Sequence, residues 1–109
     1  MALDQPSLSA ASVFFERREF QAILNLYGRM VAAGEWRDYA IDPQAEACSF
    51  SVFRKATEAP LYRIEKRPAL AARPGAWSVV GQGGVILKRG HDLEQVLRVF
   101  DKGRFKVVD

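Results

Sequence analysis

Five short runs of strand-forming residues lie between residues 36 and 89, and they constrain the fold more than any other feature of this sequence. The runs span residues 36–42, 47–55, 60–66, 77–80 and 85–89. In the second run, Cys48, Phe50 and Val52 would face one side of a strand and the residues between them the other. Runs of this length and pattern predict a mostly antiparallel sheet with one covered face.

A helix is predicted over residues 16–34, before these runs. Its apolar side chains recur with a helical period and would form one stripe; they are Phe20, Ile23, Leu24, Tyr27, Met30 and Val31. Glu16 and Glu19 suit the positive end of the helix dipole, and Gly34 suits a left-handed C-terminal cap. Gly28 is unfavourable inside a helix, and a closely packed neighbouring backbone would account for it.

The stretch GQGGVILKRGHDLEQVL, residues 81–97, has two interpretations. A phosphate-binding loop needs glycines directly before a helix, with a lysine at the start of that helix. Here the strand-like residues 85–89 separate the glycines from the helical region, which favours a hairpin turn at residues 81–84. A second helix then follows, with Asp92 at its N-cap, Gln95 completing a capping box, and an end near Gly103.

We therefore expect one α+β domain over residues 12–109, preceded by a flexible tail at residues 1–11. The expected order is β-α-β-β-β-β-β-α-β, with added strands at residues 12–15 and 105–108. Five to six strands would form a mostly antiparallel sheet with both helices on one face. The segment 67–75 contains two prolines and a glycine, so it is predicted to be a loop with at most one helical turn.

No spacing in the chain indicates catalysis or a cofactor. His91 is the only histidine and no acidic or nucleophilic partner is set by spacing, so we interpret it as a local hydrogen-bonding residue at a helix entry. Cys48, the only cysteine, shares its strand face with apolar residues and reads as a small buried side chain. The expectation is a protein that is not an enzyme and holds no metal or cofactor.

The charge is unevenly distributed. Residues 1–54 carry five basic and seven acidic side chains, whereas residues 55–109 carry eleven basic and six acidic ones. A basic half favours an anionic partner, either nucleic acid or an acidic protein surface. The candidate contacts are four cations, which would bind phosphates or carboxylates, and one aromatic residue, which would stack or pack against the partner at an open sheet face. They are Phe53, Arg63, Lys66, Lys88 and Arg89.

The alternative is a protein–protein or homodimer module without nucleic-acid binding. Large aromatic side chains beside arginine are typical of protein interfaces, which makes Trp36, Arg37 and Tyr39 candidate interface residues. The sequence has no apolar run long enough to span a membrane and no secretory leader, so a cytoplasmic location is expected.

Three blocks of the chain resemble a family of small uncharacterised alphaproteobacterial proteins that carry a domain-of-unknown-function label. The blocks are FERREFQAILNLYGRMVAAGEWRDYAID, FSVFRKATEAPLYRIEK and GVILKRGHDLEQVLRVFD, and the resemblance extends over about residues 12–101. It implies a bacterial, cytosolic source. It implies no activity, cofactor or site residue.

Overall fold

Helix α2, Arg17–Ala32, opens the part of the chain that the computed structural model describes, residues 12–55 and 57–101. It is preceded by Glu16, whose backbone N–H donates to Glu19 Oε1 at 2.8 Å, as part of a capping box. After Ala32 the chain turns at Gly34, where φ is +79°. The predicted start and end of this helix are therefore confirmed to within two residues.

A five-stranded sheet follows, and its spatial order is the order of the chain. Every neighbouring pair is antiparallel. The strands are β1 (Asp38–Pro43), β2 (Cys48–Phe53), β3 (Tyr62–Lys66), β4 (Trp77–Gly81) and β5 (Ile86–Gly90). All five strands expected from the central runs are present, and the α+β prediction is confirmed.

The two expected outer strands have different outcomes. Residues 12–15 are not a strand of the sheet; they run beside it, and Val13 N–H donates to the Gln44 carbonyl at 2.7 Å. Residues 105–108 lie outside the described residues. The segment expected to be a loop holds a single short 3-10 turn, Pro68–Leu70.

The glycine-rich stretch forms the hairpin turn that its composition favours. Residues Gln82–Gly84 link β4 to β5, and Gly83 and Gly84 both have positive φ. Helix α3 then spans Leu93–Leu97, with Asp92 at its N-cap but without the expected side-chain cap hydrogen bond. Gly103, where we expected this helix to end, is not among the described residues.

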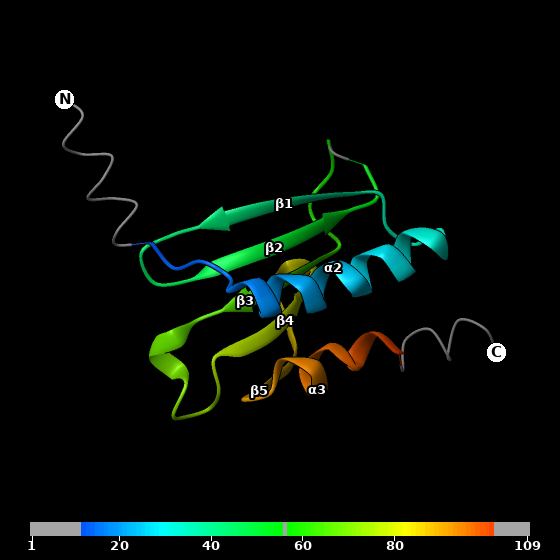
Figure 1. Cartoon of the computed structure of the whole chain (residues 1–109). Helices are drawn as coiled ribbons and strands as arrows, with labels where there is room; N and C mark the ends of the chain where they lie inside the picture. Colours follow the sequence, from blue (N-terminus) through cyan, green and yellow to red (C-terminus); the bar gives the residue numbers. More distant parts are fainter. Residues whose placement is uncertain (1–11, 56, 102–109) are drawn as a thin grey trace.

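Helices α2 and α3 both lie on one face of the sheet, as Figure 1 shows. The side chains of α2 that point at the sheet are Ile23, Leu26 and Met30, all buried. They meet Phe50, Ile64 and Val79 from the central strands and Val96 from α3, all in one apolar cluster. We call this side of the sheet the helix face and the opposite side the open face.

Candidate partner-binding surface

The open face is defined by the strand register, because side chains alternate between the two faces. Phe50 and Val79 belong to the core, so their strand neighbours point the other way. Small side chains, among them Ser51 of β2 and Ser78 of β4, occupy the middle of the face. The full set on the five strands is Asp38, Ala40, Asp42, Ser49, Ser51, Phe53, Arg63, Glu65, Ser78, Val80, Ile86 and Arg89.

Two arginines on this face flank one carboxylate. Arg63 Nη2 lies 3.9 Å from Glu65 Oε2, and Arg67 Nη2 lies 3.6 Å from Glu65 Oε1. Arg67 also approaches Glu46, at 3.8 Å. These separations exceed hydrogen-bond length, so the guanidinium N–H groups keep donors to offer. Beside them is a polar hollow of about 320 Å³, bordered by Asp42, Gln44, Ala47, Ser49, Arg63, Glu65 and Arg67.

A third arginine, Arg89, extends from β5 beside Ser78 of β4. Its Nη1 atom is shielded from solvent and has no hydrogen-bond partner within the described part of the chain. Buried polar donors in proteins are almost always paired, so this nitrogen calls for an acceptor. We name Arg63, Arg67 and Arg89 the arginine cluster.

Apart from Glu65, which lies between Arg63 and Arg67, the acidic residues on the strands of the open face lie at its opposite edge. Asp38 and Asp42 are on β1, the strand farthest from β5. The face is therefore polarised, with carboxylates along β1 and guanidinium groups from β3 to β5. A partner with the reverse arrangement would match it.

The structure divides the five predicted anion-contact residues between the two faces. Phe53 and Arg63 share the open face, as the alternation predicted, and Arg89 joins them there because it pairs with Ser78. Lys66 is on the helix face, where Nζ contacts Glu19 Oε1 at 2.7 Å and the Phe14 carbonyl at 2.9 Å. Lys88 pairs with Val79 and so also belongs to the helix side. Side chains two residues apart on a strand share a face, so the position of Lys66 on the helix face could have been predicted from that of Ile64.

The three candidate interface residues also separate. Trp36 is 2% exposed and belongs to the core, where its ring lies 5.1 Å from that of Phe100. It is therefore unavailable to a partner. Arg37 is exposed, and Tyr39 is half-exposed while stacking on Phe50 at 4.8 Å.

His91 and Cys48 occupy structural positions. His91 Nε2 lies 3.2 Å from the Ala72 carbonyl oxygen, a local contact at the surface. Cys48 is fully buried, and that burial raises the pKa of its thiol above the ordinary value. Among residues 12–55 and 57–101, no group of three metal-ligating side chains comes together. No helix in that part of the chain is long and apolar enough to cross a membrane.

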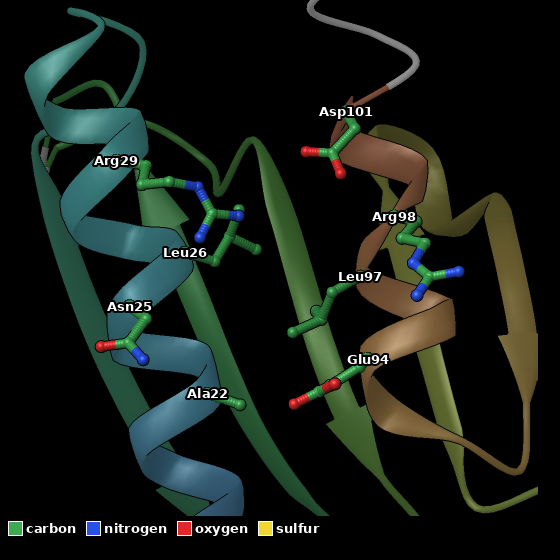
Figure 2. A pocket seen from close by; sticks show the side chains of 8 residues that line it. All are labelled: Ala22, Asn25, Leu26, Arg29, Glu94, Leu97, Arg98 and Asp101. Carbon is green, nitrogen blue, oxygen red and sulfur yellow. The ribbon is translucent and has the colours of Figure 1, made fainter.

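One groove could not be predicted from the sequence, because it forms between two helices that are far apart in the chain. Figure 2 shows it between α2 and α3, with Leu26 and Leu97 projecting toward each other and Arg29 reaching in from α2. Its volume is about 230 Å³, and it is lined by Ala22, Asn25, Leu26, Arg29, Glu94, Leu97, Arg98 and Asp101. Two cations and two carboxylates offset each other here, so the groove favours no charge class.

These features define a small α+β domain with two helices on one face of an antiparallel sheet and a polarised opposite face on which neither helix lies. The chain belongs to the family described as Protein of unknown function (DUF2794), whose model matches residues 13–97. Comparison with curated proteins and with solved structures found no match.

Proposed function

We propose that this protein is a non-enzymatic interaction module that binds an acidic protein partner through its open sheet face. The arginine cluster would contact carboxylates of the partner, and Phe53 would pack against it. The observation that carries the proposal is the pair Arg63 and Arg67, whose guanidinium nitrogens lie 3.9 Å and 3.6 Å from Glu65 and so keep N–H donors for another acceptor. A partner carboxylate at this position would accept charge-assisted hydrogen bonds from them.

The distribution of charge favours a protein over a nucleic acid. A phosphate backbone crossing the whole face would meet Asp38 and Asp42 at the β1 edge and be repelled there. Phe53 is the only aromatic side chain on the strands of this face, so stacking of successive bases has little support. A protein surface with alternating charges tolerates both signs. Cys48, a free buried thiol, fits a reducing compartment, and we place the interaction in the cytoplasm.

Charge reversal tests the proposal. The probes are a labelled poly-glutamate peptide and labelled single- and double-stranded DNA, each titrated by fluorescence anisotropy at about 50 and 200 mM salt. We expect the glutamate peptide to bind, more weakly at the higher salt. The Arg63→Glu/Arg89→Glu variant should bind it about tenfold more weakly, because two attractive contacts become repulsive.

The matched control is Arg17→Glu/Arg18→Glu, which makes the same charge change at exposed positions in the first turn of α2. Equal affinity in both variants would show that only net charge matters and would overturn the proposal. Tighter binding of DNA by the arginine cluster would replace the protein partner with a nucleic acid. Sedimentation of the same samples would reveal a homodimer held by this face, if self-association is lost in the Arg63→Glu/Arg89→Glu variant.

A further inference from the structure

The outer edge of β5 carries a continuous exposed apolar run. This strand ends the sheet, so its outer side is paired with no strand of the described chain. Val85, Ile86 and Leu87 are 58%, 51% and 43% exposed. Three consecutive apolar side chains on an unpaired edge are a template for another extended chain.

The two edges of the sheet differ in how they discourage pairing. β1 carries Asp38 and Asp42 and ends with Pro43, which has no backbone N–H to donate. In β5 the apolar run contains no carboxylate and no proline, and Lys88 directly follows it. Gly81 N–H donates to the Val85 carbonyl at 2.7 Å, and the alternation of an antiparallel ladder then turns the backbone groups of Ile86 outward.

A β-bulge in β5 lies beside a hollow that is open to a partner's side chain. Val80 pairs with Ile86 and Val79 with Lys88, so Leu87 is an extra residue in the ladder, a β-bulge. Next to it is an open hollow of about 460 Å³ between β5 and α3, which contact each other. The hollow is bordered by Leu87, Lys88, Gln95, Arg98 and Val99.

The charge around the edge is uniformly positive. Lys88 and Arg98 border the hollow, and Arg89 follows on β5. None of these three cations has a carboxylate within 4.0 Å in the part of the chain that the structure describes. Glu94 of α3 points toward α2, as Figure 2 shows, and it does not border the hollow.

We infer that the β5 edge binds an extended polypeptide segment that carries both apolar and acidic side chains and adds as a sixth strand. Its backbone would pair with the outward groups of Ile86. One apolar side chain would enter the hollow beside Leu87 and Val99, and its carboxylates would meet Lys88 and Arg98. Main-chain pairing gives such an interaction its affinity, and the side-chain hollow gives its specificity.

A second copy of this chain fits the edge less well. Pairing two β5 strands about a two-fold axis would bring Lys88 and Arg98 of both copies to the same side of the joined sheet, where like charges repel. The inference uses residues other than Arg63 and Arg67, so it stands even if binding at the open face fails.

The test uses a labelled, N-acetylated peptide of alternating valine and glutamate with the full-length protein, measured by fluorescence anisotropy. Two matched peptides accompany it: one with lysine in place of glutamate, and one with N-methyl groups on alternate backbone nitrogens. We expect binding of the first peptide only. Equal binding of the N-methylated peptide would exclude strand addition, and equal binding of the lysine peptide would exclude charge recognition.

Protein variants locate the contact. Lys88→Glu/Arg98→Glu should weaken binding of the valine–glutamate peptide about tenfold, and Leu87→Asp should weaken it similarly, because both place carboxylates against carboxylates. Arg17→Glu/Arg18→Glu should leave it unchanged. A loss in Arg63→Glu as large as that in Lys88→Glu/Arg98→Glu would put the peptide on the open face and overturn the inference. All substituted side chains are exposed or near the surface, and thermal unfolding checks that each variant folds. Unchanged binding in Lys88→Glu/Arg98→Glu, or a dimer that Leu87→Asp dissociates, would overturn the inference.

Discussion

At the scale of single residues, two glycines differ in whether the surrounding structure leaves room for a side chain. Gly75 has φ of +124°, and a Cβ atom there would lie 2.3 Å from the carbonyl carbon of Gly90. The loop before β4 thus passes directly against the end of β5. At Gly28, in the middle of α2, no other segment of the described chain comes within 4 Å of a Cβ position. The sequence suggested that a packed backbone explains Gly28; that expectation was wrong, and the close approach occurs at Gly75.

Alanine substitution should therefore act in opposite directions at the two sites. Gly75→Ala should destabilise the fold by about 2–4 kcal/mol, from strained φ together with the backbone clash. Gly28→Ala should stabilise it by about 0.5–1 kcal/mol, because alanine restricts the unfolded chain and favours helix. Urea unfolding measures both. A destabilised Gly28→Ala variant would mean that this side of α2 is covered by something other than the described residues.

At the scale of elements, α2 is fastened to the sheet by one ion pair as well as by its apolar side chains. Lys66 and Glu19 are 2.7 Å apart, and their side chains are only 14% and 23% exposed. Lys66 Nζ also lies 5.9 Å from the centre of the Trp77 ring. This pairing links the first turn of α2 to the end of β3.

A double-mutant cycle would measure that link. Lys66→Met and Glu19→Gln, alone and together, should reveal a coupling free energy of about 1 kcal/mol in urea unfolding. The surface pair Arg63 and Glu65, 3.9 Å apart, is the matched control, and its coupling should be near zero. Equal coupling in the two pairs would contradict the assignment of Lys66 to a structural role.

The elements themselves were largely predictable from the sequence, because period and turn chemistry are local signals. Helix α2, the five strands and the turn at Gly83 and Gly84 follow from them. Lys88 could not be placed, since the extra residue Leu87 breaks the alternation of β5. Trp36 was misjudged because its burial depends on Phe100, which is distant in the sequence. Val31, which was predicted to lie on the apolar stripe, is exposed, whereas Leu26, which was not, is buried. Which of the two faces the core depends on how α2 is rotated against the sheet.

At the scale of the whole molecule, the buried thiol of Cys48 and the partly buried phenol of Tyr27 limit stability at alkaline pH. Burial raises the pKa of the Cys48 thiol above 9.0, and burial followed by the nearby Asp38 raises that of Tyr27 above 10.0. The folded protein thus keeps protons that the unfolded chain loses, so stability should be full below about pH 8 and fall as pH rises past 9. Urea unfolding across this range measures the slope. Cys48→Ala should make it shallower, and an unchanged slope would exclude the thiol as a cause.

The order of the sheet bears on how the chain folds during synthesis. Each strand pairs with its neighbour in sequence, so the sheet can grow as the chain emerges, with only short loops to close. The core, however, needs residues from before the first strand and after the last one. Trp36 follows α2, and its partner Phe100 follows α3. A nascent chain still lacking α3 would hold a growing sheet whose helix face is only half covered. The helix face would then become covered, and protected from aggregation, only after α3 has left the ribosome.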